Sequence, residues 1–155
     1  MVPKPRKAKT VLATGVFDIL HLGHIHFLEE SKRIGGRNAR LVVIVARDAT
    51  VLKRKGRPPV LPEKQRQRIV ATLKPVDTAV LGYQHLDFLG ILQRYQPDVV
   101  AFGYDQTDMM TQVEKLIRKK QLPIRVAQVR RFSVNGLDSS TGIKRKVAAS
   151  LAGKS

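Results

Sequence analysis

Residues Lys9–Glu30 read KTVLATGVFDILHLGHIHFLEE, an apolar run followed by a turn and a helical pattern. The β-branched run that ends at Gly15 is typical of a buried strand. Apolar residues then recur at helical spacing from about residue 22 to 34, and the glycine pair at 35–36 predicts the end of that helix. The stretch therefore predicts a strand joined to a helix by a short glycine-containing turn.

The rest of the chain repeats this alternation. Strands are predicted at 39–46, 77–82, 97–103 and 123–129, and helices at 61–74, 86–95, 106–121 and 139–152. Strands that alternate with helices of this length indicate parallel pairing with right-handed crossovers. We predict an α/β fold with a single Rossmann-like domain, in which helices cover both faces of a five-stranded parallel sheet. Residues 1–8 are predicted to form a flexible basic tail before the domain at 9–155, and 51–61 a flexible loop.

Composition narrows the classes of protein that are possible. The chain has 155 residues, of which 43% are hydrophobic, so it can bury the core of one domain. It has no cysteine, which excludes disulfides, thiolate metal sites and cysteine nucleophiles. Because no apolar run approaches the roughly 18 residues of a membrane span, we expect a cytoplasmic protein without a membrane partner.

The formal net charge of +17 suggests a polyanionic partner, which could be nucleic acid, a membrane surface or nucleotide phosphates. A charge that only promotes solubility is the alternative. In open α/β sheets, ligands bind beyond the carboxyl ends of the strands. The segments predicted there are 14–24, 47–57, 103–108 and 130–141, and all four carry polar or basic residues suited to phosphate.

Three of the four histidines lie in the first turn and helix. His21 and His24 are three residues apart, so they share a face at the helix N-terminus, where unpaired N–H groups favour anions. Two imidazole donors there suit a phosphate that gains charge during a reaction, and Gly23 leaves room for a bulky group beside them. A metal pair or a simple helix cap are the alternatives. His26 is predicted to pack and His85 to lie on the surface.

These motifs together resemble a known family. TGVFDILHLGH, at 14–24, resembles the H-x-G-H signature of the cytidylyltransferase-like nucleotidyltransferases, and SSTGIK, at 139–144, resembles their second signature. Over the whole chain the similarity is greatest to the archaeal-type FAD synthetases, through VARD at 45–48, LKPVD at 73–77 and GYDQ at 103–106. Members of that group often have proline in place of Tyr104 and carry C-terminal cysteines.

The resemblance implies adenylyl transfer from ATP to FMN, which gives FAD and pyrophosphate by direct in-line attack. His21, His24 and Lys55, the last in the loop after the second strand, are the implied catalytic residues. The implied nucleotide contacts lie at strand ends and helix starts: Thr14, Gly15, Val16, Phe17, His21, His24, Gly103, Asp105, Ser139, Ser140 and Thr141.

The acceptor is implied to contact Asp18, Lys55 and Arg66, although Arg68 lies close enough in sequence to take the place of Arg66. Asp18 is left with three roles, namely orienting its loop, contacting the acceptor or helping to hold Mg²⁺. Magnesium is expected mainly on the triphosphate. The family resemblance also implies a homodimer.

The identity of the acceptor substrate is the most specific of these predictions. We expect Phe132 and Val134, with Phe17 and Leu22, to edge an apolar shelf for the flavin ring, with packing under the loop as the alternative for Phe132. A CTP-dependent enzyme for glycerol 3-phosphate or another small phosphomonoester is one competing hypothesis. A nucleic-acid-binding module without catalysis is another, which the 5% aromatic content makes the weaker one. A nucleotide sensor without catalysis is the third.

Overall fold

Short β-branched segments of the chain pair as one parallel sheet in the computed structural model, which describes residues 7–133 and 136–153. The strands of this part of the chain are β1 (Thr10–Gly15), β2 (Arg40–Val45), β3 (Thr78–Leu81), β4 (Val99–Phe102) and β5 (Arg125–Gln128). The helices are α1 (Leu22–Ile34), α2 (Asp48–Lys55), α3 (Glu63–Ala71), α4 (Phe88–Tyr95), α5 (Thr107–Lys119) and α6 (Ser140–Ala152). Most of the predicted tail, residues 1–6, lies outside the described residues.

The sheet has the strand order β3-β2-β1-β4-β5, with every neighbouring pair parallel. β1 is central, and its register aligns Thr10 with Arg40 of β2 and Val11 with Val99 of β4. The chain leaves β1 toward one edge of the sheet and returns at β4 toward the other. The order therefore reverses between β1 and β4, and a crevice opens beyond their carboxyl ends.

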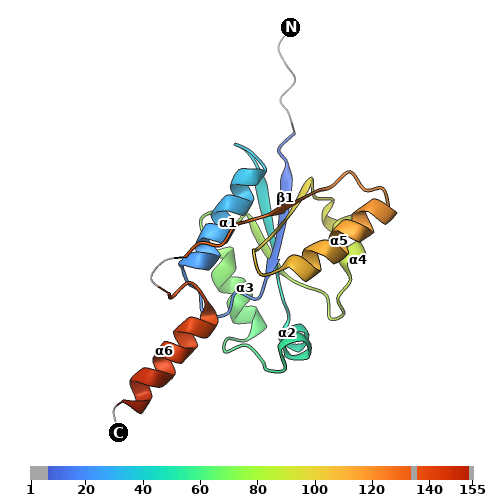
Figure 1. The fold of residues 1–155 in the computed structure, drawn as a ribbon. Helices are drawn as coiled ribbons and strands as arrows, with labels where there is room; N and C mark the ends of the chain where they lie inside the picture. The colour runs from blue at the N-terminus through green and yellow to red at the C-terminus, as the bar shows by residue number, and fades with distance from the viewer. Residues whose placement is uncertain (1–6, 134–135, 154–155) are drawn as a thin grey trace.

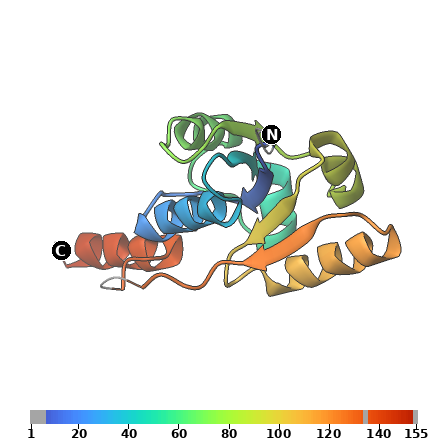
Figure 2. The same ribbon diagram turned by 90° about the horizontal axis from the view of Figure 1, so that it is seen from above.

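Helices cover the two faces of the sheet, as predicted (Figures 1 and 2). On one face, Leu28 of α1 and Val70 of α3 are fully buried against β1 and β2. On the other face, Ile91 of α4 and Val113 of α5 pack with Phe102. Because both faces are covered, β2 reads as a continuous apolar run instead of an alternating one. The predicted fold class is confirmed.

The helix α2 corrects the prediction of a flexible loop at 51–61. Asp48 lies in its first turn, three basic residues occupy its last turn, and Gly56 follows with a left-handed φ of 70°. Each of these features stabilises a helix, through the helix dipole or by the αL cap. The basic run KRK was interpreted as a loop because the two prolines at 58–59 lie so close. The structure ends the helix before them.

The last helix, α6, extends away from the sheet and buries none of its residues (Figure 2). It begins where predicted, with Ser139 as the cap whose Oγ accepts the N–H of Gly142 at 3.0 Å. Only its first turns contact the domain: Ser140 Oγ donates to the carbonyl of Asp18, and Lys144 Nζ lies 3.1 Å from the Asp18 carboxylate. No helix within 7–133 or 136–153 is long and apolar enough to cross a membrane.

Candidate active site

A cavity of about 380 Å³ lies at the carboxyl edge of the sheet, beyond β1 and β4. All four segments that the sequence placed there contribute residues to its wall, from within 14–24, 46–59, 103–106, and 129–132 with 138–141. Gln106 joins two of them, because its side chain accepts the Gly103 N–H at 2.7 Å and donates to the Thr14 carbonyl at 3.0 Å. Gln106 had no predicted role, since a bridge across 92 residues leaves no local signal.

His21 and His24 lie together on the wall of this cavity. Their rings stack with centroids 3.8 Å apart. His21 is the N-cap of α1, and its Nδ1 accepts the N–H of Gly23 at 3.1 Å. Since that nitrogen is an acceptor, the neutral ring carries its proton on Nε2, which makes Nε2 a donor. Helix capping and a donor role are thus compatible in one histidine.

His24 is held as a neutral ring. Burial, followed by the proximity of His21 and Lys55, lowers the pKa of His24 from 6.5 to about 3, and the attraction of Asp18 offsets only part of this effect. Burial also lowers the pKa of His21, against an opposing attraction by Asp138. Both rings therefore act at neutral pH as dipolar donors and not as cations. Among the described residues, Nδ1 of His24 is a buried side-chain nitrogen without a hydrogen-bond partner.

The low pKa of His24 predicts a pH-dependent stability. In the unfolded chain this histidine binds a proton near pH 6.5, whereas in the folded protein it stays neutral down to about pH 3. Acid therefore favours unfolding, so the free energy of unfolding should fall as the pH drops from 6.5 toward 3. Between pH 7 and 4.5 the loss should be on the order of 2 kcal/mol. Urea unfolding of the wild type and of His24→Gln checks this, and equal pH slopes for the two would contradict it.

Two glycines allow the histidine loop to fold closely on itself. A Cβ at Gly15 would lie 2.8 Å from the ring of Phe17, and one at Gly23 would lie 2.8 Å from the carbonyl oxygen of Asp138. Gly23 was predicted to leave room for a ligand, but the space is taken by the 138 backbone and by the ring of His21. Phe17 adopts a φ of 54°, a conformation rare for such a residue, and its side chain is buried.

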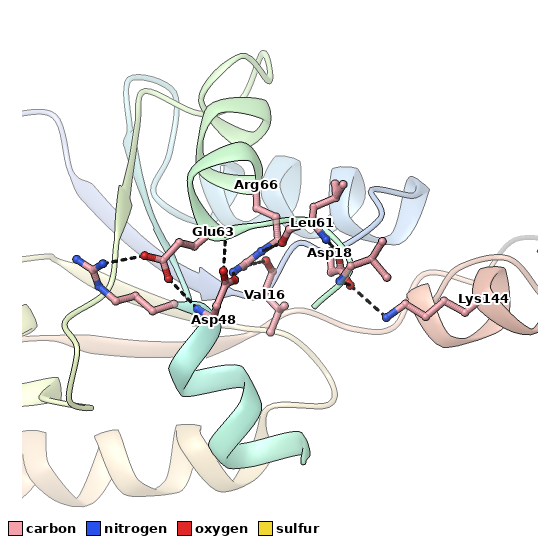
Figure 3. Close-up of polar contacts among 9 residues, drawn as sticks. Val16, Asp18, Asp48, Leu61, Glu63, Arg66 and Lys144 are labelled. Carbon is pink, nitrogen blue, oxygen red and sulfur yellow. Dashed lines mark hydrogen bonds and ion pairs between the residues drawn. The ribbon is translucent and has the colours of Figure 1, made fainter. Parts of the chain in front are cut away.

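Arg66 takes a different place from the one predicted for it. Its side chain is fully buried and does not line the cavity (Figure 3). Nε donates to the Leu61 carbonyl at 2.9 Å, one terminal nitrogen to the Val16 carbonyl at 2.6 Å, and the other to the Asp48 carboxylate at 2.6 Å. Arg66 therefore fastens the histidine loop to α2 and α3. Arg68, the alternative, is exposed on the outside of α3.

The N-termini of α2 and α3 also cap each other. The carboxylate of Glu63 accepts the N–H of Asp48 at 2.8 Å, and that of Asp48 accepts the N–H of Glu63 at 3.2 Å. Glu63 further pairs with Arg47 at 2.9 Å. A negative charge at each helix start is favourable. Together with Arg66, these contacts fix α2, and thereby Lys55, relative to the histidines.

Both oxygens of the Asp18 carboxylate accept hydrogen bonds from other groups of the protein. It accepts the N–H groups of Val60 and Leu61 at 2.8 and 3.0 Å and pairs with Lys144. Burial by itself would raise the pKa of Asp18, but these hydrogen bonds and the Lys144 charge outweigh it and lower the pKa. Of its three predicted roles, loop orientation is the one this geometry supports.

The remaining predicted residues lie around the same cavity. Lys55 is exposed at the end of α2 and lines it, and so does exposed Asp105 after β4. Ser139, Ser140 and Thr141 bring the N-terminus of α6 to its edge. Sequence reasoning missed the further cations on this wall, which share only their charge with the predicted set: Arg54, Arg57, Arg130 and Lys144. Part of the +17 charge is therefore concentrated at the cavity.

The predicted apolar shelf is present only in part among the described residues. Phe17 is buried and lines the cavity, whereas Leu22 is 59% exposed and does not line it. Phe132 reaches the wall, but its ring stacks on His26 with centroids 4.6 Å apart. That contact agrees with the packing predicted for His26. Val134 lies outside the described residues.

The described residues hold no group of three or more histidine, aspartate or glutamate side chains that could bind a metal ion. Asp18 does not fit as a magnesium ligand, because both of its oxygens already accept hydrogen bonds from the protein.

Comparison with known proteins gives a consistent result. The FAD synthase of Methanothermobacter marburgensis is 46% identical over 144 residues, which cover 93% of this chain and 88% of the relative. The FAD synthase of Methanopyrus kandleri is 46% identical over 139 residues, or 90% of this chain and 91% of the relative. The crystal structure of the lipopolysaccharide core biosynthesis protein from Thermoplasma volcanium matches with a TM-score of 0.74 and 38% identity, over 82% of this chain and 100% of that one.

The match to a family model agrees with the site. The model described as cytidylyltransferase-like covers residues 12–146, from within β1 to within α6. The matched range includes both histidines and the serine-rich start of the last helix. This protein therefore belongs to the cytidylyltransferase-like family.

Proposed function

We propose that this protein is a nucleotidyltransferase that transfers AMP from ATP to FMN, giving FAD and pyrophosphate. The observation that carries the proposal is its similarity, over about 90% of the chain, to archaeal proteins named FAD synthase. The cavity supplies a consistent chemistry, with two neutral histidines, a helix N-terminus and several cations around one space. Such a site suits the polyphosphate of ATP.

In this reaction a phosphate oxygen of FMN attacks the α-phosphorus of ATP. The bond from that phosphorus to the bridging oxygen breaks on the opposite side, and pyrophosphate leaves. His21 and His24 donate to the phosphate oxygens as negative charge grows on them. The N–H groups at the start of α6 and the side chains of Ser139 and Thr141 hold the β- and γ-phosphates. The enzyme acts by position and charge and needs no covalent intermediate.

Further residues position the two substrates. The turn at 14–17 and Gly103 bring backbone against the nucleotide, and Asp105 accepts hydrogen bonds from its ribose. Asp18 and Arg66 act on the acceptor indirectly, by fixing the loops on either side of it. Magnesium enters bound to ATP, where it neutralises phosphate charge. A homodimer and a cytoplasmic location complete the proposal, and sedimentation of the purified protein tests the first.

The direct test is to incubate the protein with ATP, magnesium and FMN and to separate the products by chromatography. FAD and pyrophosphate in equal amounts are expected. Omitting FMN should abolish pyrophosphate release, which excludes simple ATP hydrolysis. Rapid CDP-glycerol formation from CTP and glycerol phosphate, without FAD, would instead favour the cytidylyltransferase hypothesis. Salt-sensitive binding of an arbitrary oligonucleotide without any transfer would favour the nucleic-acid module.

Lys55→Ala should lower turnover while leaving the affinity for ATP largely intact. Lys55 is exposed at the end of α2 and lines the cavity, and in the proposed mechanism it contacts the reacting phosphates mainly in the transition state. Steady-state kinetics with varied ATP check this. Lys53→Ala is the matched control, because Lys53 is exposed in the same helical turn but does not line the cavity. If Lys55→Ala weakens ATP binding as much as it slows turnover, Lys55 is only a binding residue.

A further inference from the structure

A second hollow adjoins the active-site cavity on the side of α4. It lies beyond the carboxyl ends of β2 and β3, between α2 and the segment 82–88. We call it the β3–α4 slot. Its volume is about 60 Å³, and its floor is the apolar core of Ile44, Phe102 and Met109. Its mouth is formed by Thr50, Arg54, Tyr83, His85, Leu86 and Phe88.

The slot is continuous with the active-site cavity. Thr14, Ala46, Thr50, Arg54 and Met109 line both spaces. Arg54 is exposed between them and therefore places a guanidinium at the junction. A molecule with a phosphate at one end and an apolar body at the other can span this junction, its phosphate toward Arg54 and Lys55.

A reaction that binds two large substrates at the same time needs this additional space. A cavity of about 380 Å³ lies near the lower end of the roughly 300–1,000 Å³ that pockets for one drug-sized ligand occupy. The proposed reaction holds two such ligands at once, ATP and FMN. Leu22 does not line this cavity and the ring of Phe132 already stacks on His26, so the large ring of FMN needs a further apolar surface.

Two large side chains with apolar surface are exposed to solvent at the mouth of the slot. Tyr83 is 37% exposed and Leu86 is 54% exposed, and they follow one another closely after β3. Exposed apolar residues grouped at the mouth of a hollow indicate a binding surface. The ring of Tyr83 lies over the first turns of α4, where a Cβ at Gly90 would come within 3.2 Å of it. Tyr83 thus packs against α4 and also lines the slot.

We propose that the β3–α4 slot receives the isoalloxazine ring of FMN, a proposal that rests on the proposed function. The apolar dimethylbenzene end points toward the floor of the slot, and the rest of the ring lies against Tyr83 and Leu86. The ribityl chain then passes Thr50 and Arg54, and the phosphate reaches the α-phosphate of ATP beside Lys55. The adenosine stays on the side of Gly103 and Asp105, neither of which lines the slot.

Kinetics of FAD formation test the slot once the wild type has been shown to make FAD. Tyr83→Ala and Leu86→Asp should each raise the KM for FMN roughly 10-fold or more, with the KM for ATP within about 2-fold of the wild type. Tyr104→Ala is the matched control, since Tyr104 is a similarly exposed tyrosine that lines only the active-site cavity. An unchanged KM for FMN in both slot variants would overturn the proposal. So would a rise in the KM for ATP alone, because the adenine would then occupy the slot.

Flavin fluorescence gives a readout that does not depend on turnover. A phenol ring in contact with a flavin quenches its fluorescence by electron transfer, whereas a phenylalanine ring does not. The chain has three tyrosines and no tryptophan, so few side chains can quench. Titration of FMN and of riboflavin should show quenching that is lost in Tyr83→Phe and kept in Tyr104→Phe. The reverse pattern places the ring in the main cavity and overturns the proposal.

The two failures are distinguishable. A protein that binds FMN with Tyr83-dependent quenching but makes no FAD contradicts the proposed function and leaves the slot as a flavin site. A protein that makes FAD, with neither slot variant affecting FMN, contradicts the slot alone. A protein that neither binds flavin nor makes FAD contradicts both.

Discussion

His21→Ala and His24→Ala should each lower the turnover number for FAD formation by roughly 10²- to 10³-fold, the usual effect of removing one preorganised donor. The positions of the two histidines in the structure support this expectation. The rings stack at 3.8 Å on the cavity wall, and His21 presents Nε2 as its donor because Nδ1 is taken by the Gly23 N–H. Neither imidazole has to lose or gain a proton to act. Above pH 7, turnover should therefore depend little on the protonation of these two groups.

Single-turnover kinetics are the measurement, with circular dichroism to verify the fold of each variant. His26→Ala is the matched control, because His26 lies on the same helix but does not line the cavity. It should keep turnover within a few-fold of the wild type. Near-normal turnover in His21→Ala or His24→Ala would remove that histidine from the mechanism.

The double variant distinguishes two ways in which the pair can act. Residues that work as a unit have strongly non-additive effects. Because the rings contact each other, the double alanine variant should be only slightly slower than the slower single variant. Additive losses would mean that the two histidines stabilise separate charges.

Arg66→Met should lower the free energy of unfolding by roughly 2–5 kcal/mol, because the Val16 and Leu61 carbonyls would each lose a donor, at about 1–3 kcal/mol apiece. Asp48 would lose its partner as well, but its side chain is 40% exposed, so water can replace the guanidinium there. For a protein of this size, the melting temperature should fall by roughly 5–15 °C. Urea and thermal unfolding measure both quantities.

Arg68→Met is the control for stability, since Arg68 is an exposed arginine on the same helix. Arg66→Lys should recover only part of the loss, because one ammonium cannot reproduce three diverging N–H donors. The direct acceptor contact implied by the family resemblance predicts something else. If Arg66 touched FMN, Arg66→Met would raise the KM for FMN and leave the unfolding curve unchanged.

The role of Arg66 explains why a residue outside the cavity can still affect catalysis. It ties the carbonyl of Val16, in the histidine loop, to Asp48, at the start of the helix that ends in Lys55. Val16 directly follows β1, whereas Lys55 ends the helix that follows β2. A shift of either part would misalign donors with the phosphates, and small misplacements are costly in such sites.

Much of the architecture could be predicted from local pattern. The strand that ends at Gly15 and the helix from Leu22 to Ile34 begin and end as predicted, because β-branched runs and helical periodicity are properties of neighbouring residues. The alternation of strands and helices fixed parallel pairing, and parallel pairing placed four strand ends at one edge. The cavity wall therefore follows from the order of elements alone, before any side chain is positioned.

The failures have a different origin. The motif around Arg66 resembles the family pattern and implies an acceptor contact, yet the burial of Arg66 depends on a carbonyl 50 residues away. Residue type predicts a shelf that includes Leu22 and Phe132, but packing exposes Leu22 and stacks Phe132 on His26 at the cavity wall. Local pattern favours a loop in place of α2 because of the nearby prolines, whereas the capping signals of the segment favour the helix.

The sequence by itself determined the fold class, the edge of the sheet that carries the site and the pair of histidines at a helix start. These depend on periodicity and on spacing within a few residues. Only the tertiary structure decided which polar side chains form hydrogen bonds within the protein and which remain accessible to a ligand. Arg66 and Asp18 have their hydrogen-bonding capacity filled by backbone groups from distant loops, whereas Lys55 and Arg54 remain exposed at the cavity. The physical reason is that hydrogen bonding and burial depend on contacts between distant segments, which exist only once the sheet has brought those segments together.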